Sequence, residues 1–240
     1  MGHLHFSYDQ YSERYIVDEL EKYLRPISGF VEYCIVDHHD NAHEWKPEQR
    51  KVAGRFATSY IDVDQSLADG VKLYGLMGTC SADTAEVYET LFDPHTDELR
   101  KDVKELLGDV TFRNILVINR VEILPAYRGM GIGLATILNL IRRDSAGCGI
   151  VALKAFPFQF RAGRLGYLEE SDWENKMGYD PYSQTMEFAH EKLLFHLMRL
   201  GFKRIGDRGV VAISASMQNP IPKEIHRWVH RSVKPKPVQL

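Results

Sequence analysis

The sequence predicts an α/β (α+β) fold in which helices flank a mixed β-sheet. Three patterns support this prediction: an alternating apolar segment at residues 30–37, an apolar strand leading through a glycine-rich turn into a helix at residues 114–143, and a β-rich apolar segment at residues 149–156. With 240 residues, 44% of them hydrophobic and 26% charged, the chain is long enough to bury one large core. We therefore expect a single domain over residues 1–240.

The N-terminal half contains both helix and strand patterns. Residues 15–24 have helical periodicity, and Pro26 predicts that this helix ends there. Residues 30–37 alternate as a strand, and residues 52–63 are either its partner or the next strand. Residues 82–107 predict two helical pieces that are broken at Pro94.

Histidines and aspartates gather between the two predicted strands, at residues 37–43 (DHHDNAH). A metal site and a polar turn both attract these residue types. The H-E-x-x-H spacing of a catalytic zinc site is missing, so the sequence favours the turn, and we expect no metal site.

The junction between the predicted strand near residue 114 and the next helix is the most informative segment. Gly129, Gly131 and Gly133 have no Cβ, so the backbone can turn tightly and approach a ligand closely. Amides at a helix start point outward without partners and favour an anion, and Arg128 adds positive charge beside them. The following helix has an apolar stripe made of Leu134, Ile137, Leu138 and Ile141. The alternative is a glycine-rich turn that binds no ligand.

Two phosphate-binding motifs are excluded by spacing. A P-loop ends in Gly-Lys-Ser/Thr, whereas Gly133 is followed by Leu134 and Ala135. A dinucleotide-binding turn requires G-x-G-x-x-G, whereas these glycines are spaced G-x-G-x-G. The anion site is therefore of a different kind.

The segments downstream of this helix form a recognisable series. Residues 149–156 predict a strand, residues 187–200 a helix that ends in Leu200-Gly201-Phe202, and residues 210–214 a further strand. Gly201 suits the left-handed position that stops a helix.

Together these features resemble the GNAT superfamily of N-acetyltransferases. Its motif A, Arg/Gln-x-x-Gly-x-Gly/Ala after a strand, is matched by Arg128, Gly131 and Gly133, and Leu-Gly-Phe follows at the family's place. The resemblance covers about residues 111–216. It implies an acyl-CoA N-acyltransferase-like, partly split sheet, in which residues 111–216 form the acetyl-CoA-binding core, residues 1–110 the acceptor side and residues 217–240 a basic tail.

The resemblance implies acetyl-CoA as co-substrate. Amides around residues 129–133 would hold its pyrophosphate, and the strand backbone near Ile123 would pair with the pantetheine arm. His190 stands where many members carry an asparagine that contacts the cofactor. The implied cofactor-binding residues are Ile123, Leu124, Arg128, Gly129, Met130, Gly131, Ile132, Gly133 and His190.

The implied reaction is acetyl transfer to a primary amine of a small molecule or peptide, by direct attack in a ternary complex. An amine is mostly protonated at pH 7, so a base or a water chain must remove a proton. Backbone amides of the motif A strand can polarise the thioester carbonyl. The family's usual base and acid positions hold Val117 and Leu197, which transfer no proton.

Three other residues are therefore candidates for catalysis. Glu122 is the only carboxylate on the strand, and the alternative is that it simply pairs with Arg120 or other charges. Regular alternation places Val117, Asn119, Val121 and Ile123 on one face and Glu122 on the other, unless a bulge intervenes. His190 can protonate the sulfur or be an ordinary helix-end histidine, and Tyr182 is a further donor. His196, about 100° away from Leu197 around the helix, is expected at a packing or surface position.

The missing base and acid leave two other functions open. One is a non-catalytic acyl-CoA-binding or regulatory protein, and the other is an acyltransferase that uses a different acyl-CoA. The long connection at residues 157–183 mixes acidic and aromatic residues, which suits a cationic amine acceptor, although a solvated acidic helix has the same composition. The tail could contact the 3′-phosphate of CoA or a second copy in a homodimer, or be loose.

Composition narrows the remaining classes. A net charge of −3 argues against a nucleic-acid binder. The sequence lacks an apolar run of the ~18 residues that cross a membrane, and its first residues do not match a signal peptide. Cys34, Cys80 and Cys148 are scattered and suit free thiols in a reducing compartment. We expect a cytoplasmic protein.

Overall fold

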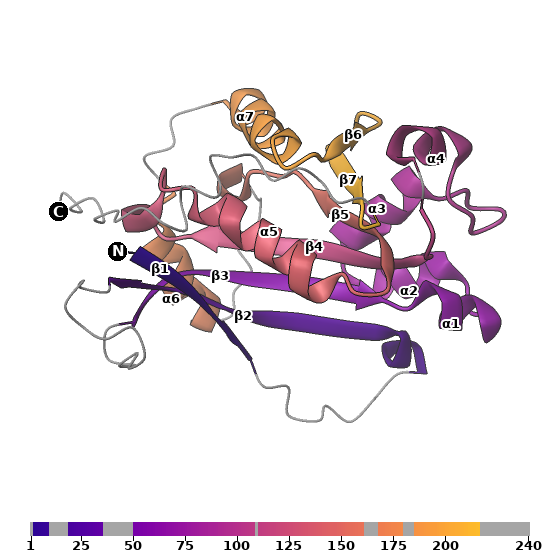
Figure 1. The fold of residues 1–240 in the computed structure, drawn as a ribbon, viewed down its shortest axis with the longest axis horizontal. Helices are drawn as coiled ribbons and strands as arrows, with labels where there is room; N and C mark the ends of the chain where they lie inside the picture. The colour runs from indigo at the N-terminus through magenta and orange to yellow at the C-terminus, as the bar shows by residue number, and fades with distance from the viewer. Residues whose placement is uncertain are drawn as a thin grey trace.

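The computed structural model describes residues 2–9, 19–35, 50–108, 110–160, 168–179 and 185–216. Within these residues a mixed sheet of seven strands has the order β1-β2-β3-β4-β5-β7-β6 (Figure 1). The strands are β1 (Gly2–Tyr8), β2 (Leu24–Ile35), β3 (Arg50–Ile61), β4 (Asn114–Ile123), β5 (Cys148–Lys154), β6 (Lys203–Ile205) and β7 (Val210–Ser214). Neighbours are antiparallel except β4 and β5, which are parallel. The predicted mixed sheet with flanking helices is confirmed.

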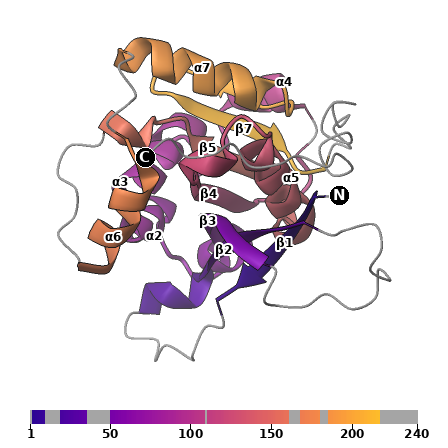
Figure 2. The ribbon, with the colours of Figure 1, turned by 90° about the vertical axis from the view of Figure 1, so that its left-hand side faces the viewer.

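Helices cover both faces of this sheet. They are α1 (Val63–Ala68), α2 (Leu73–Cys80), α3 (Ala82–Leu91), α4 (Lys101–Leu107), α5 (Ile132–Asp144), α6 (Leu168–Met177) and α7 (Met186–Met198). One buried cluster joins Leu140 of α5 and Leu194 of α7 to Leu116 of β4. The other joins residues of α1 to α4 to the opposite face of β4, at Ile115. Figure 2 shows α5 on one side of β4, and α2 and α3 on the other.

The N-terminal helix prediction was wrong at its end. A short 3-10 helix at Glu19–Tyr23 is followed at once by β2, so Leu24 lies in a strand and Pro26 lies inside it, opposite Ser59. A proline is tolerated there because β1 pairs with β2 only from Gly29 onward, so no described strand needs an N–H from Pro26 on that edge.

The next predictions were largely confirmed. The strand predicted at residues 52–63 is β3, but it stops at Ile61 because Asp62 caps a helix, its side chain accepting a hydrogen bond of 3.1 Å from Gln65 N. Residues 82–107 form the two predicted helices, α3 and α4. The strands β1 and β6 and the helices α1 and α2 were not predicted.

A bulge in β4 changes which side chains share a face. Arg120 pairs with Ala57 and Ile118 with Thr58, so Asn119 has no partner of its own on β3. Val121 consequently packs in the same cluster as Ile118, while Val117 packs on the opposite face. Regular alternation was therefore wrong for this strand.

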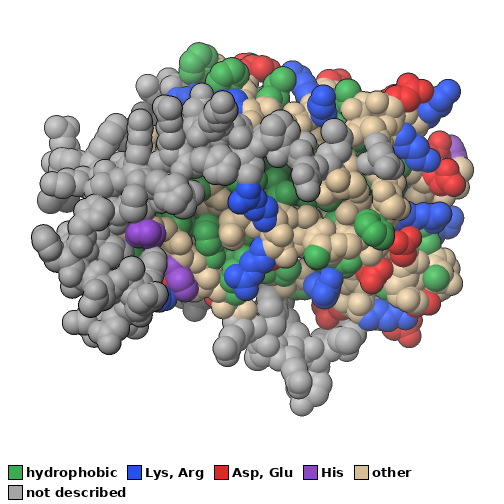
Figure 3. Space-filling model, in the orientation of Figure 1, with side chains coloured by type: hydrophobic (Ala, Val, Ile, Leu, Met, Phe, Trp, Pro, Cys, Tyr) green, Lys and Arg blue, Asp and Glu red, His purple; other side chains and the backbone are tan. Residues whose placement is uncertain are grey.

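The helix α7 has apolar residues on more than one side. Leu194 and Leu197 are buried against the sheet. Hydrophobic side chains also lie on the surface over α7 (Figure 3). The exposed ones on this helix are Met186, Phe188, Phe195 and Met198. Apolar periodicity alone therefore cannot tell which of its polar residues face the interior.

Candidate functional site

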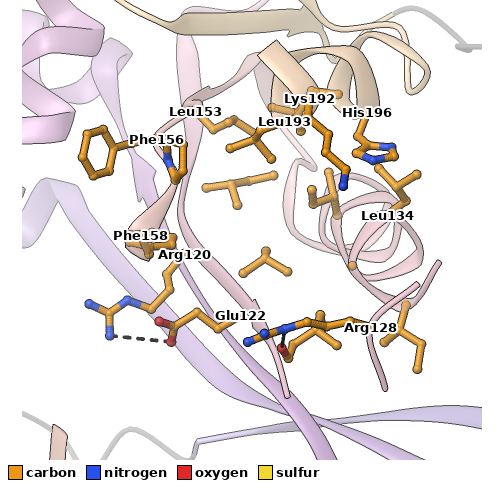
Figure 4. Close-up of a pocket in the computed structure, with 18 of the residues that line it drawn as sticks. Arg120, Glu122, Arg128, Leu134, Leu153, Phe156, Phe158, Lys192, Leu193 and His196 are labelled. Atoms are coloured by element: carbon orange, nitrogen blue, oxygen red, sulfur yellow. Dashed lines mark hydrogen bonds and ion pairs between the residues drawn. The ribbon is translucent and has the colours of Figure 1, made fainter. Parts of the chain in front are cut away.

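A pocket lies where β4 and β5 separate. The two strands pair from Asn114 with Cys148 to Val117 with Ala152, and their pairing stops there. Beyond that point lies a pocket of about 540 Å³ (Figure 4). It is lined by residues 118–123 of β4, the end of β5, the start of α5, and α7.

The residues that line the pocket come from both faces of the sheet. On one side it is lined by Ile132 and Leu197, which belong to the core beneath α5 and α7. On the other side it is lined by Lys154, whose Nζ lies 2.6 Å from a carboxylate oxygen of Glu86 on α3.

The glycine turn has the geometry of an anion site. Gly129 and Gly131 have φ values of 73° and 79°, in the left-handed region that glycine adopts without strain. Gly131 is the N-cap of α5, and the first helical hydrogen bond runs from Ala135 N to Gly131 O at 3.0 Å. The amides of Ile132 and Gly133 therefore have no intrahelical acceptor. Glycines 129, 131 and 133 all line the pocket, whereas Met130 does not.

The side chain of Arg128 joins the end of β4 to the end of α6 beside this turn. Its Nε donates to Ile123 O at 2.7 Å, and its Nη2 donates to Met177 O, at the end of α6, at 2.6 Å. Figure 4 shows the guanidinium at the lower edge of the pocket. Leu124 is not among the residues that line the pocket, and its N–H donates to Ala53 O on β3 at 2.8 Å.

Glu122 lies in the pocket wall within a network of donors. Its side chain is 6% exposed. Arg55, its partner on β3, donates to Oε2, and Tyr179 donates to Oε1 at 2.9 Å. Arg120 Nη1 is 4.0 Å from Oε2. This carboxylate is held in place from two sides.

Tyr179 was not found from the sequence. It follows α6, and the ring of Trp173 on that helix lies 4.9 Å from the guanidinium of Arg55. Burial, and then the charge of Glu122, raises the pKa of the Tyr179 hydroxyl well above its ordinary value. The phenol therefore stays protonated at neutral pH. No sequence spacing links residues 55, 122 and 179, because the contact depends on how α6 packs on the sheet.

The bulge residue Asn119 also lines the pocket. Its Nδ2 donates to Ser59 Oγ at 2.7 Å, while its buried Oδ1 has no hydrogen-bond partner within the described ranges. A buried acceptor without a donor costs free energy, and a ligand N–H would offset that cost.

The opposite wall, on α7, presents residues that differ from the predicted ones. Lys192 and His196 project from α7 toward the cavity (Figure 4). The pKa of His196 lies below its ordinary value because the ring is desolvated by burial and because Arg199 and Lys192 are nearby. His196 was expected to be a packing or surface residue, and the structure places it in the pocket wall.

The other predicted residues lie elsewhere. His190 is not among the residues that line the pocket. It packs beside Gly209, where an added Cβ would lie 2.8 Å from its Nε2. Tyr182, residues 37–43 and the tail at residues 217–240 lie outside the described residues. In the described part of the chain, no group of three or more His, Cys, Asp or Glu side chains could hold a metal ion. None of the described helices combines the length and apolar character needed to cross a bilayer.

Comparisons with known proteins gave no relative. No protein-family model, curated protein or solved structure matches the chain.

Proposed function

We propose that the protein is an acetyl-CoA-dependent N-acetyltransferase with an acyl-CoA N-acyltransferase-like fold, acting on a primary amine in a ternary complex. The observation that carries this proposal is the pocket in the opened sheet. Its lining joins the outward amides at the start of α5 to the bulged part of β4 and includes residues from both faces of the sheet. An elongated thioester with a diphosphate at one end suits one face of such a pocket, and an amine suits the other.

The carrier would be held largely by backbone groups. Amides of residues 129–133 would bind the diphosphate, as helix N-termini bind anions. Among the described strands, none pairs with residues 118–123 of β4 on the β5 side, so the amide groups of the pantetheine arm can pair with them. Ile123 lines this stretch, although its carbonyl already accepts from Arg128.

The chemistry would take place at the bulge. The amine nitrogen attacks the thioester carbonyl carbon, the C–S bond breaks, and the thiolate takes up a proton. Backbone N–H groups of β4 would stabilise the oxyanion. Glu122 retains lone pairs on both oxygens besides those used by Arg55 and Tyr179, so it can accept the amine proton directly or through a water. His190 lies outside the pocket lining, so Tyr182 stays the candidate of the two for protonating the thiolate.

A second candidate function has its own support. Val117 and Leu197, at the usual base and acid positions, are buried hydrophobic residues, and the oxygens of Glu122 are engaged. In this chain the helices α1 to α4 lie between β3 and β4. The family pattern instead has a strand, two helices and a hairpin before the motif A strand. These departures favour an acyl-CoA-binding protein without transfer activity.

A thiol-release assay separates the two functions. Acetyl-CoA and longer acyl-CoAs are incubated with a broad panel of primary amines, and CoA release is compared with direct binding of the same thioesters. We expect amine-dependent release that Glu122→Gln lowers by about 100-fold, a typical contribution of a general base. Binding without release from any amine would support the binding protein. Release of CoA from only a longer acyl-CoA would identify that thioester, and not acetyl-CoA, as the acyl donor.

A further inference from the structure

The α7 wall of the pocket carries positive charge that the proposed reaction does not use. Lys192 and His196 are four residues apart on this helix, so their side chains lie on one face with Cβ atoms about 5–6 Å apart. Both line the pocket, and Figure 4 shows both pointing toward the cavity. Arg199 lines the same wall.

No acid offsets these two side chains within the described part of the chain. Lys192 and His196 make no ion pair there, and the acid nearest to them in sequence, Glu191, lies 3.4 Å from Arg204 on β6 instead. Among the described lining residues the only carboxylate is Glu122, on β4, where Arg55 and Tyr179 hold it. The α7 wall is therefore prepared for an anion from outside the protein.

The hydrogen bonding of the His196 ring also suits an external anion. Its Nδ1 is buried and has no hydrogen-bond partner among the residues that the structure describes. Within the described part of the chain, no carbonyl or carboxylate therefore holds this imidazole in one tautomer or stabilises its charged form through Nδ1. It also lies in the last turn of α7, where the helix dipole favours the protonated ring.

The pocket thus offers two anion receptors of different chemistry. The amides of Ile132 and Gly133 at the start of α5 are neutral dipoles, and the α7 pair consists of a cation and a titratable ring. Coenzyme A carries two separate anionic groups, a diphosphate and a 3′-phosphate monoester. A monoester dianion is the group that gains most from an ammonium and an imidazolium.

We propose that Lys192 and His196 bind the 3′-phosphate of the coenzyme A carrier and make the site selective for coenzyme A over carriers that lack this phosphate. The inference rests on the proposed function for the identity of the ligand. It does not depend on acetyl transfer, because it concerns binding of the carrier alone.

The test compares CoA with dephospho-CoA, which lacks only the 3′-phosphate, by calorimetric titration at pH 7. We expect the unaltered protein to bind CoA at least about 10-fold more tightly, the size of effect that one charge-assisted contact supplies. Lys192→Gln and His196→Gln should each remove most of this preference and leave the affinity for dephospho-CoA unchanged. Lys192→Arg should keep the preference because it keeps the charge.

Two matched controls use residues outside the pocket. Lys203 on β6 and His95 between α3 and α4 are exposed, so Lys203→Gln and His95→Gln should leave both affinities unchanged. Equal affinity of the unaltered protein for the two ligands would overturn the inference and leave the proposed function standing. Equal weakening of both ligands by Lys192→Gln would also overturn it. Failure of both ligands to bind would overturn the inference and the proposed function together, whereas selective binding without acetyl transfer would support the inference and remove only the catalytic part.

Discussion

The hydroxyl of Tyr179 donates a hydrogen bond of 2.9 Å to Oε1 of Glu122, inside the pocket that separates β4 from β5. Arg55 holds the other oxygen from β3. The pair joins the end of α6 to the centre of the sheet, so the packing of that helix and the position of the candidate base are one structural feature. Changes in this network should alter stability and activity together.

Removal of Arg55 tests how far the network stabilises the fold. Arg55→Met leaves the buried carboxylate of Glu122 without its main partner, which should lower the free energy of unfolding by about 3 kcal/mol. Tyr179→Phe removes one hydrogen bond and should cost about 1 kcal/mol. Urea denaturation measures both. Arg204→Met, which breaks the exposed pair with Glu191, is the control and should cost less than about 1 kcal/mol. Equal losses for Arg55→Met and Arg204→Met would contradict the role of the buried pair.

Alanine substitutions at two glycines with nearly the same backbone conformation distinguish an effect on folding from an effect on binding. Gly129 and Gly70 have φ values of 73° and 75°, and an added Cβ would meet no atom within 4 Å at either position. Alanine should therefore lower the free energy of unfolding by a similar amount, about 1 kcal/mol, at both positions. Only Gly129→Ala should weaken CoA binding, because its methyl group stands beside the amides of the α5 turn. Equal CoA affinity of the two variants would remove the glycine turn from the site.

The approach of β3 to β4 beside Glu122 depends on Gly54. An added Cβ there would lie 2.3 Å from the backbone oxygen of Glu122, so Gly54→Ala should force the strands apart and cost more than about 3 kcal/mol. Gly75→Ala, in the middle of α2 with no atom within 4 Å of the added Cβ, should instead raise stability by about 0.5–1 kcal/mol. In thermal denaturation the melting temperature should fall for Gly54→Ala and rise for Gly75→Ala. A shift in the same direction for both variants would refute the contact between Gly54 and the backbone of Glu122.

Binding of CoA should be coupled to a proton through His196. Its charged neighbours are Lys192 and Arg199 on α7, with Arg128 across the pocket and Glu122 farther along β4. Burial and the α7 cations lower the pKa of the free ring, so it is neutral at pH 7. A bound phosphate raises the pKa of His196, so this ring takes up a proton when CoA binds. The affinity for CoA should therefore fall as the pH rises from 7 through the pKa of His196 in the complex.

Calorimetry in two buffers with different ionisation enthalpies measures this uptake directly. We expect uptake of part of a proton with CoA, and none with dephospho-CoA or with His196→Gln. Measurement above pH 7 avoids titration of the phosphate itself, whose second pKa is about 6. The same uptake with dephospho-CoA would assign the proton to another group.

Local sequence patterns located the elements of the second half of the chain well. The strand predicted at residues 210–214 matches β7, and Gly201 has the left-handed backbone expected after a helix, with a φ value of 92°. Turn and cap residues specify such features within a few positions of the chain, which is why they can be predicted without a tertiary structure. The glycine turn before α5 was predicted for the same reason.

The sequence could not predict which residues meet. Lys192 and His196 face the pocket while His190, on the same helix, packs beside Gly209, and the apolar residues on several sides of α7 leave this rotation undetermined. Similarly, nothing local predicted the bulge at Asn119, because it depends on how β4 fits the register of β3.

The sequence by itself determined that a strand, a glycine turn and a helix follow one another, because the missing Cβ atoms and the helix start act over a few residues. Only the tertiary structure decided that β4 and β5 separate at Val117, that Glu122 is held by Arg55 and Tyr179, and that α7 turns Lys192 and His196 toward the same cavity. These relationships join residues that are distant in the chain, and the packing of helices on the sheet sets them.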